Sequence, residues 1–418
     1  MANKKNKQKK EMSLKNILIG IVGLVLVAIA AFFGIDIDEF LGEGAANTSV
    51  TQEQPDIAAQ LTAVASLPGD VTPFTLEKGF GGERAFWQVY FTAPQRFSAE
   101  PEETCRGGID EVVVTAINET VRTLDIAAFE WSNACITRAV VDAHERGVTV
   151  RMVVDDHFTV EENEEAVLLG EVSPFQWIID AGIPFRDDER SGLMHNKFMI
   201  MDSQRVLTGS MNFTPRGAYV NNNNILFMRS QRAVAAYQQK FDNMFERGGF
   251  GPRGSVPKDV QFTQDGVPVR IIFSPGDAVD QILIDEINNA QSEIRFMAFS
   301  FTLDSVGEAV LARSQAGVDV AGIFETRASQ TQFSQLPPLF CAGLDIYQDG
   351  QSRRTFHHKV FVIDRTTVMT GSFNFSQNAT TRNDENMVII RDPSLAELYL
   401  AEFERALQGA VRPGISCD

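Results

Sequence analysis

The chain of 418 residues exceeds the usual size of a single hydrophobic core, so two domains are expected. Its formal net charge is −18, although residues 1–15 contribute +5, which leaves −23 for the remainder. A body this acidic repels polyanions and lacks the broad basic surface of a protein that binds nucleic acid tightly, which argues against that class.

An apolar run from Ile17 to Ile35 follows the lysine-rich start of the chain. These 19 residues would rise about 28 Å in a helix, close to the roughly 30 Å hydrocarbon core of a bilayer. Lysines before the run and acidic residues after it predict a single-pass membrane anchor, with the rest of the chain outside the cytoplasm. The alternative is a cleaved signal peptide and a secreted protein, since residues 28–30 offer small side chains for cleavage.

Beyond a linker rich in small and polar residues, one sequence pattern occurs twice. An expected strand at residues 89–94 corresponds to a second at 271–275, and an expected helix at 110–118 corresponds to one at 280–288. Each copy ends in a helix, which has a tyrosine and a phenylalanine at matching positions. The repetition predicts that one folding unit has been duplicated.

Helices that alternate with β-rich runs predict an α/β fold. We expect two duplicated α-β-α sandwich domains related by a pseudo-twofold axis, as in a homodimer, preceded by an N-terminal transmembrane helix. The expected division is residues 1–40 for the basic tail and anchor, 41–83 for a linker, 84–250 for the first domain, 251–267 for a second linker and 268–418 for the second domain.

The four cysteines are an even number, which permits two disulfides in an exported protein. Pairing Cys105 with Cys135 and Cys341 with Cys417 would keep each bridge within one copy, although the sequence leaves the pairing open. No Cys-x-x-Cys spacing occurs, so a zinc site is not expected.

The identity between the copies is densest over one motif, H-x-K-x4-D-x6-G-S-x-N. The first copy supplies His195, Lys197, Asp202, Ser210 and Asn212, and the second supplies His357, Lys359, Asp364, Ser372 and Asn374. An isolated histidine near a lysine is a weak signal. The same residues at fixed spacing, found at matching points of a repeat, indicate a functional site.

The spacing gathers these side chains on one face. Residues two apart in a strand point to the same side, so each histidine lies beside its lysine. The glycine before each serine lets a ligand approach the backbone closely, and each asparagine can donate a hydrogen bond from the same edge. If the two copies meet, the paired imidazoles, ammonium groups, amides and hydroxyls suit a singly anionic tetrahedral phosphate.

Both motif copies resemble the signature of the phospholipase D superfamily, and the likeness runs from about Arg84 to the C-terminus. The resemblance implies that one histidine attacks phosphorus to form a phosphohistidine, while the other protonates the leaving oxygen and then activates water. It assigns His195 as nucleophile and His357 as acid and base, with the roles open to exchange. Lys197 and Lys359 would stabilise charge on the non-bridging oxygens. The implied chemistry requires no metal or other cofactor, and the sequence shows no carboxylate cluster suited to magnesium or calcium.

The two copies differ fourteen residues after the motif glycine, where the second copy has Glu385 and the first has Asn223. In relatives, a carboxylate at this position hydrogen-bonds an active-site histidine and raises its basicity. If the pairing crosses between the copies, Glu385 supports His195 as the nucleophile. If the pairing stays within one copy, His357 is favoured.

Several other residues with titratable side chains are expected to be structural. Asp202 and Asp364 are counted with the catalytic motif, but we expect them to fix the local fold rather than to touch substrate. His358 faces away from its neighbours on a strand, and His144 lies on a charged helix surface. His157 follows two aspartates at a strand end, from which it could line the pocket, but the second copy has no matching histidine.

The motif does not choose the substrate, because it is similar to both nuclease-like and cardiolipin-cleaving members of the superfamily. The expected anchor and the acidic body favour a phospholipid. An exported nuclease is the alternative, transfer to an alcohol is also open, and a non-catalytic phosphate-binding protein is the third hypothesis. Between strand and motif, residues 157–194 and 327–356 must form the pocket walls. We expect the acidic run at 161–165 to be a solvated helix face, and the apolar run at 333–340 to be core rather than a lipid-facing lip.

Overall fold

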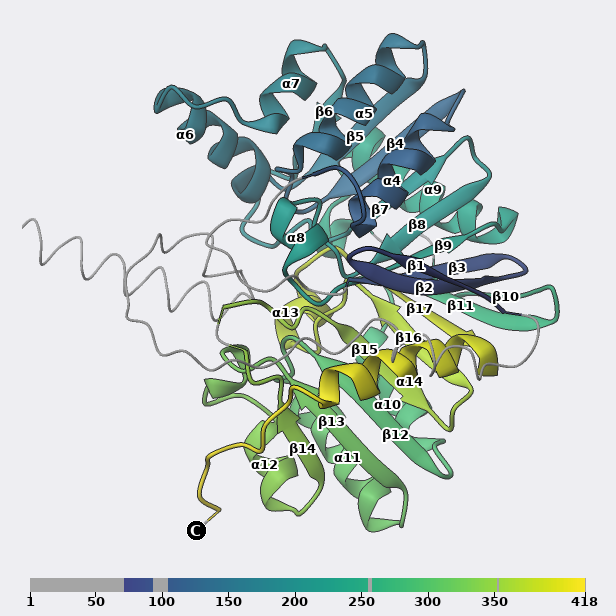
Figure 1. The fold of residues 1–418 in the computed structure, drawn as a ribbon, viewed down its shortest axis with the longest axis vertical. Coiled ribbons are helices and arrows are strands. Elements are labelled where there is room, and N and C mark those ends of the chain that lie inside the picture. Colours follow the sequence, from purple (N-terminus) through teal and green to yellow (C-terminus); the bar gives the residue numbers. More distant parts are fainter. Residues whose placement is uncertain (1–70, 93–103, 255–257, 352, 418) are drawn as a thin grey trace, which may run out of the picture. The chain divides into compact units, whose positions relative to one another are not determined.

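The computed structural model describes residues 71–92, 104–254, 258–351 and 353–417 (Figure 1). These residues all belong to one compact unit, Gln52–Asp418. The expected transmembrane helix and most of the first linker lie outside the described residues. Within the described ranges, no helix combines the length and hydropathy needed to cross a bilayer.

The first half of the body is a nine-stranded mixed sheet with helices on both faces (Figure 1). The strand order is β1-β2-β3-β9-β8-β7-β4-β5-β6, in which β4, β5 and β6 are parallel and the other neighbours are antiparallel. Its elements are β1 (Thr72–Leu76), β2 (Gly79–Arg84), β3 (Trp87–Thr92), α4 (Ile109–Asn118), β4 (Thr123–Ala128), α5 (Ala134–Glu145), β5 (Thr149–Val154), the π-helical turn η1 (Asp156–Glu161), α6 (Glu162–Leu168), α7 (Pro174–Asp180), β6 (Phe185–Arg186), β7 (Phe198–Met201), β8 (Arg205–Gly209), α8 (Pro215–Tyr219), β9 (Asn224–Met228), α9 (Gln231–Arg247) and the 3₁₀ turn η2 (Gly251–Arg253).

The second half repeats this architecture in an eight-stranded sheet with the order β10-β11-β17-β16-β15-β12-β13-β14. Its elements are β10 (Val260–Gln264), β11 (Val267–Ser274), α10 (Val279–Asn288), β12 (Glu293–Ala298), α11 (Asp304–Gln315), β13 (Asp319–Phe324), the 3₁₀ turn η3 (Ala328–Gln330), α12 (Leu336–Cys341), β14 (Asp345–Gln348), β15 (Lys359–Ile363), β16 (Thr367–Gly371), α13 (Gln377–Thr381), β17 (Glu385–Arg391) and α14 (Pro393–Leu407). From β3 and β11 onward, the two sheets have matching strand orders and pairing directions, as the duplication predicts.

Side chains alternate between two cores along each strand, because successive residues of a strand point to opposite faces. In β7, Met199 and Met201 pack against α4, α5 and α7, whereas Phe198 and Ile200 face a core that includes α9. The core around α9 is continuous with side chains from both sheets and from α14. The two halves therefore share one hydrophobic core rather than meeting only at their surfaces.

The two longest helices of the described body, α9 and α14, have capping residues at their ends. Ser230 caps the N-terminus of α9 by accepting a hydrogen bond from the Ala233 amide, and Gly248 ends the helix in the left-handed conformation at φ 62°. Asp392 caps α14 by accepting a hydrogen bond from the Ser394 amide. The helix begins with Pro393, which is favourable because the first N–H group of a helix has no partner within the helix, so the missing N–H of proline costs nothing there. Both helices are thus positioned by local sequence as well as by the shared core.

The expected domain boundaries need two corrections. Residues 72–83, which were assigned to a linker, form β1 and most of β2 and extend the first sheet. Strand β10 lies inside the expected second linker, 251–267, and pairs with β11. Both segments form antiparallel hairpins at a sheet edge. The outer strands β1 and β10 have one exposed face, and the buried part of β2 is mostly glycine, so neither segment has the continuous apolar run that marks a buried strand.

The backbone contacts between the halves are reciprocal. Met194 forms a bridge to Asp384, and Asn222 forms the equivalent bridge to Phe356. Met194 corresponds to Phe356 in the repeat, and Asp384 corresponds to Asn222. The two bridges are therefore the same contact made once in each direction, as in an isologous dimer interface. These bridges lie directly beside the two His-x-Lys segments.

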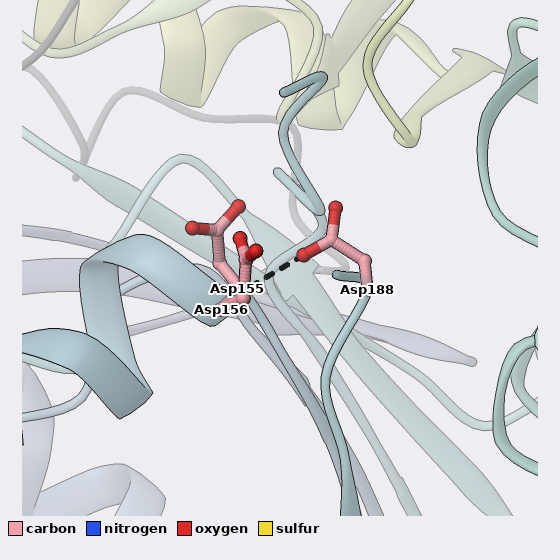
Figure 2. A group of neighbouring side chains, drawn as sticks. All are labelled: Asp155, Asp156 and Asp188. Atoms are coloured by element: carbon pink, nitrogen blue, oxygen red, sulfur yellow. Dashed lines mark hydrogen bonds between the residues drawn. The ribbon is translucent and has the colours of Figure 1, made fainter. Parts of the chain in front are cut away.

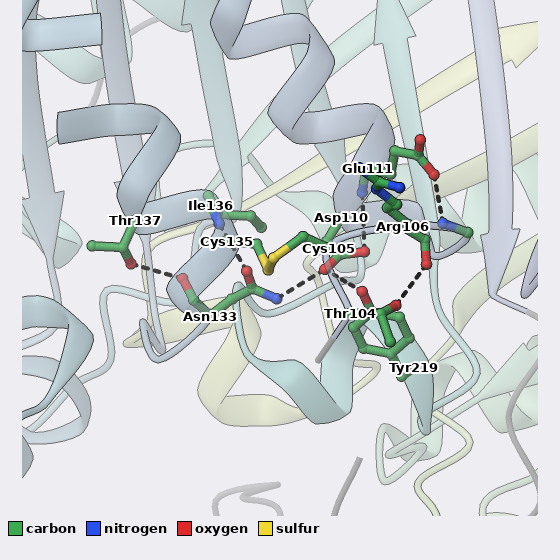
Figure 3. The surroundings of a disulfide bond; sticks show 11 residues. Thr104, Cys105, Arg106, Asp110, Glu111, Asn133, Cys135, Ile136, Thr137 and Tyr219 are labelled. Carbon is green, nitrogen blue, oxygen red and sulfur yellow. Dashed lines mark hydrogen bonds between the residues drawn. A yellow bond between two sulfur atoms is a disulfide. The ribbon is translucent and has the colours of Figure 1, made fainter. Parts of the chain in front are cut away.

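Both disulfides that the cysteine count permits are present, each within one half of the body. Cys105 and Cys135 join the segment before α4 to the first turn of α5, as Figure 3 shows. Nearby, Tyr219 donates a hydrogen bond to the buried carboxylate of Asp110. Cys341 and Cys417 tie the C-terminal segment to α12. The pairing that stays within each copy is confirmed.

The two segments expected to form pocket walls differ in character. The acidic run at 161–165 is largely exposed on η1 and α6, as expected of a solvated helix face. In the apolar run, Leu336 and Leu339 are buried core residues, whereas Phe333 is 52% exposed. The expectation that this run is core holds for the leucines and fails for Phe333.

Candidate active site

The two His-x-Lys segments lie at the start of equivalent strands, where the halves meet. His195 and Lys197 immediately precede β7, and Lys359 opens β15 two residues after His357. All four side chains are buried, with exposed fractions of 6% or less. The backbone N–H of His195 donates to the Asp384 carbonyl, so this histidine is held by the other half of the chain.

Each histidine ring is also anchored across the interface. Nδ1 of His195 lies 2.8 Å from Oε2 of Glu385, and Nδ1 of His357 lies 3.0 Å from Oδ1 of Asn223. The pairing crosses between the copies, which is the arrangement that favours His195 as the nucleophile. Because each ring is bound through Nδ1, Nε2 is the nitrogen that is left to react in both.

The serines of the motif position these anchors. Ser210 donates its hydroxyl proton to Oδ1 of Asn223, and Ser372 donates to Oε2 of Glu385. Each hydroxyl oxygen also accepts a backbone N–H from the following strand. Both hydroxyl protons are already used to hold the residues behind the histidines, so in this structure Ser210 and Ser372 position the anchors, and direct binding of phosphate by these serines stays a prediction.

The asparagines of the motif keep free polar atoms. The side-chain oxygens of Asn212 and Asn374 are buried and have no hydrogen-bond partner among the described residues. Buried polar atoms without partners are costly, and a bound ligand is one way to satisfy them. The same oxygen is free in both copies, and because an amide oxygen only accepts hydrogen bonds, it suits a hydroxyl or water donor of a ligand. Binding of phosphate oxygens by these two residues would use their amide N–H groups and stays a prediction.

Two phenylalanines that the motif does not include complete the site. The Nζ atoms of Lys197 and Lys359 lie 4.7 Å and 4.9 Å from the ring centroids of Phe129 and Phe299, respectively. The same rings lie 4.6 Å and 4.9 Å from the imidazoles of His195 and His357. The sequence did mark these phenylalanines, as identical residues at matching positions of the repeat, but only tertiary contact gives them a place in the site.

The buried charges perturb one another strongly. Burial lowers the pKa of His195, and the charges of Lys197, Lys359 and His357 lower it further. Burial likewise lowers the pKa of Lys197 to about 8 and raises the pKa of Glu385 to about 8. Groups from both halves act on one another, so the two motif copies form a single electrostatic site. Perturbed groups of this kind cluster at catalytic sites.

The two aspartates of the motif lie outside this cluster. The Asp202 carboxylate accepts hydrogen bonds from the backbone N–H groups of Val121, Arg122 and Thr123, at the end of β7 remote from Lys197. Five residues of extended chain separate Asp202 from Lys197 by about 16 Å. Asp364 makes the equivalent bonds to the N–H groups of residues 291–293. The structure does not bring these two aspartates to the cluster, and their hydrogen bonds to backbone N–H groups agree with the expected role in fixing the local fold.

The remaining histidines have roles apart from the cluster. His358 is fully buried, with Nε2 2.9 Å from a Glu402 oxygen and Nδ1 3.1 Å from the Asn224 amide nitrogen, which confirms a structural position. His157 is exposed and pairs with Glu161 on the same turn. His144 is half-buried on α5.

A cluster of three carboxylates lies nearby, although none was expected from the sequence. Asp155 and Asp156 at the end of β5 approach Asp188 from the loop after β6 (Figure 2). Burial raises the pKa of Asp155 to about 6 and that of Asp188 to about 8. Asp155 accepts hydrogen bonds from the Phe158 and Met194 amides, so these oxygens already stabilise the turn and the residue before His195.

A groove with a volume of about 1080 Å³ lies at another place on the first sheet. Its lining includes Asp202, Arg205, Tyr90 and Phe227, and none of the motif histidines or lysines. The groove therefore does not coincide with the buried cluster, where the chemistry-bearing side chains meet.

Comparison with known proteins places this site in a family. A family model described as "Cardiolipin synthase, PLD-like domain" matches residues 113–245 and 283–407, which is more than half of the chain. Over 125 residues, the chain is 34% identical to a mitochondrial cardiolipin hydrolase of Xenopus tropicalis, covering 30% of this chain and 55% of that protein. Over 135 residues, it is 33% identical to a phospholipase D of Rickettsia felis, covering 32% of this chain and 67% of that protein.

The chain thus spans about half the length of the cardiolipin hydrolases it matches. The fold is also similar to that of phosphatidylserine synthase from Haemophilus influenzae, with a TM-score of 0.59 and 12% identity over 85% of this chain and 91% of that one. The family model covers both halves, each of which contributes one His-x-Lys segment to the buried cluster. The chain belongs to the phospholipase D superfamily.

Proposed function

We propose that this protein is a phosphodiesterase that hydrolyses its substrate through a phosphohistidine on His195, with His357 as general acid and then base. The proposal rests chiefly on one observation. Two buried imidazoles, one from each half, are each held through Nδ1 by a residue of the opposite half, which leaves Nε2 of each for reaction. The two halves, related by a pseudo-twofold axis, would then act from opposite sides of one phosphorus atom.

In the first step, Nε2 of His195 attacks phosphorus, and the bond from phosphorus to the leaving oxygen breaks. A proton on Nε2 of His357 moves to that oxygen, which departs as an alcohol. In the second step, Nε2 of His357 takes a proton from water, whose oxygen attacks phosphorus. The P–N bond breaks, its electron pair returns to His195, and both histidines regain their starting states.

The remaining cluster residues fit this sequence of steps. Glu385 would stabilise the positive charge that develops on His195 as the P–N bond forms. Lys197 and Lys359 would stabilise negative charge on the non-bridging oxygens in a buried site, where such interactions are stronger than in water. The free side-chain oxygens of Asn212 and Asn374 are placed to accept hydrogen bonds from hydroxyl or protonated phosphoryl groups.

A phospholipid is the favoured substrate. The net charge of −18 disfavours a polyanionic nucleic acid, and the named relatives include cardiolipin hydrolases and a phospholipase D. The two disulfides fit a location in an oxidising compartment outside the cytoplasm, which agrees with an anchor at residues 17–35.

The test compares the full chain with His195→Asn, His357→Asn and, as a matched control, His144→Asn on α5. Each protein is assayed in EDTA on a chromogenic phosphodiester, phospholipid vesicles and single-stranded DNA. We expect both motif variants to lose at least about 10³-fold in kcat and the control to retain full activity. Preference for vesicles over DNA supports the lipid assignment, and the reverse preference would identify a nuclease.

The intermediate is tested separately with a diester that has an activated leaving group and a labelled phosphoryl group. His357→Asn should accumulate acid-labile label on His195, because departure no longer needs the acid whereas hydrolysis still needs the base. The two roles would be exchanged if label accumulates on His357 in the His195→Asn variant and none forms on His195 in the His357→Asn variant. Turnover that survives both substitutions, or that needs added metal, contradicts the mechanism.

A further inference from the structure

The two histidines are held in almost the same way, but by chemically different groups. Glu385 and Asn223 occupy equivalent positions, each receives a hydrogen bond from the matching serine, and each contacts the histidine of the other half. Both side chains are fully buried, with 0% exposure. One site of the pair therefore has an ionisable anchor, whereas the other has a neutral amide.

The orientation of the Asn223 amide is determined by its surroundings. Its Nδ2 donates to the Gly217 carbonyl at 3.0 Å, and its Oδ1 accepts from the Ser210 hydroxyl at 2.9 Å. Since Oδ1 is only an acceptor, the ring nitrogen that faces it must carry a proton. Nδ1 of His357 is thus a constant donor, and only Nε2 of this ring is free to gain or lose a proton.

The charges around His357 all favour loss of that proton. Lys359 lies on its own strand, Lys197 comes from the other half, and His358 is the next residue along the chain. Within the described part of the chain, no carboxylate is hydrogen-bonded to the His357 ring. The carboxylates of Glu385 and Glu130 raise the pKa of both lysines. Burial and these neighbours lower the pKa of His357.

From the proposed function and this geometry, we propose that Asn223 is a positioning residue that makes His357 the proton donor of the pair. Its amide fixes the Nδ1–H form of the ring, so that Nε2 is the titrating atom. Because the amide is uncharged, it does not stabilise the imidazolium, and the Nε2 proton is released readily to a leaving oxygen. Glu385 is the ionisable counterpart of Asn223, and in its carboxylate form it would stabilise the positive charge that a nucleophilic His195 acquires.

The decisive variant is Asn223→Glu, which gives both halves the same anchor. Asn223→Gln has the same length without charge and is its matched control. Asn118→Glu adds a charge at an exposed helix end and controls for the net charge of the protein. A carboxyl against His357 should raise the pH at which Nε2 loses its proton by about 1 to 3 pH units, whereas neither control should move it by more than about 0.5.

The measurement uses imidazole nitrogen NMR of the full chain labelled with ¹⁵N-histidine. The chain has five histidines, so the His357 signals can be assigned by their loss in His357→Asn. In the wild type, we expect Nδ1 to stay protonated throughout the titration, and Nε2 to be the nitrogen of this ring that gains and loses a proton. In Asn223→Glu, the Nε2 titration and the limb of the pH–rate profile that follows it should move together.

The wild-type spectrum keeps the proposal testable even if Asn223→Glu fails to fold. A wild-type His357 protonated on Nε2 and bare at Nδ1 would overturn it. Equal effects of Asn223→Glu and Asn223→Gln would also overturn it, because length rather than charge would then be responsible. The NMR result does not depend on turnover, so absence of diester cleavage would count against the proposed function and leave this inference to be decided by the spectrum.

Discussion

Replacing Glu385 with glutamine should expose how much of the catalysis depends on a single buried charge. Glutamine keeps the size of the side chain and an acceptor oxygen for Nδ1 of His195 and for the Ser372 hydroxyl. The negative charge is lost, together with the Oε1 acceptor that receives a 3.4 Å hydrogen bond from the Asn383 amide. The variant therefore tests electrostatic stabilisation of the phosphohistidine separately from positioning of the ring.

The size of the effect follows from the geometry. The Glu385 oxygen lies 2.8 Å from Nδ1 of His195. The centre of the ring charge is then about 4 Å away, and two unit charges at that distance interact by about 4 kcal/mol at an effective dielectric constant of about 20. Loss of this stabilisation from the transition state corresponds to a decrease of about 10³-fold in kcat.

The effect should depend on pH in a defined direction. Burial raises the pKa of Glu385 to about 8, so the carboxylate that glutamine lacks predominates only above that pH. The ratio of wild-type to variant kcat should be greatest above about pH 8 and fall about tenfold per pH unit below it, because glutamine resembles the protonated acid.

The assay is steady-state turnover of a chromogenic diester between pH 5 and 10, with thermal unfolding of both proteins as a control for the fold. A variant that unfolds at the wild-type temperature and retains kcat within about tenfold at pH 9 would refute the reasoning. A large decrease that is the same at every pH would also refute it, because the missing property would then not be the charge.

Three further changes test the supports of the site. Asp202→Ala removes the acceptor for three backbone N–H groups and should lower the free energy of unfolding by about 1–2 kcal/mol without changing kcat. Denaturant titration and turnover measure the two quantities, and an inactive variant of unchanged stability would show that Asp202 takes part in catalysis. Glu402→Gln should cost about 3–5 kcal/mol at pH 7, because it leaves Arg405 buried without its carboxylate. The pKa of Glu402 is lowered to about 2, so the wild-type advantage should be complete above about pH 4.5 and be lost as the pH falls toward 2; an advantage that persists at pH 2 would contradict this. The double variant Cys105→Ser and Cys135→Ser opens a loop with a sequence separation of 30 and should lose about 3–4 kcal/mol in denaturant titration, whereas an unchanged midpoint would show that the native contacts already restrain this loop.

The repeated motif allowed most of the site to be predicted, because its side-chain types and spacing carry the chemistry directly. A histidine and a lysine two apart in a strand must share a face, wherever the strand lies. The repetition also predicted a second sheet with the same strand order. The motif did not show where its aspartates lie: the structure places Asp202 and Asp364 against backbone N–H groups at the far ends of their strands, because a shared motif does not require that all its residues lie together.

Edge strands and side-chain neighbours were less predictable. Strands β1 and β10 lie in segments expected to be linkers, since an edge strand with one solvated face has no continuous apolar run. Strand β2 lies between β1 and β3 and is mostly buried, but its buried residues are three glycines and one phenylalanine, which give no apolar run either. Asp188 comes beside Asp155 and Asp156 only because β6 runs parallel to β5, so that both strands end at the same edge of the sheet.

The sequence by itself determined that two equivalent sets of histidine, lysine, serine and asparagine side chains exist, and that one of the two equivalent anchor positions, Asn223, lacks a carboxylate. It did not determine which histidine each anchor holds. That choice was decided by the shared core and by the reciprocal bridges between the halves, which bring Glu385 to His195 and Asn223 to His357. The physical reason is that hydrogen bonds act over about 3 Å, whereas these partners are 190 and 134 residues apart in the chain, so only the packed tertiary structure can pair them.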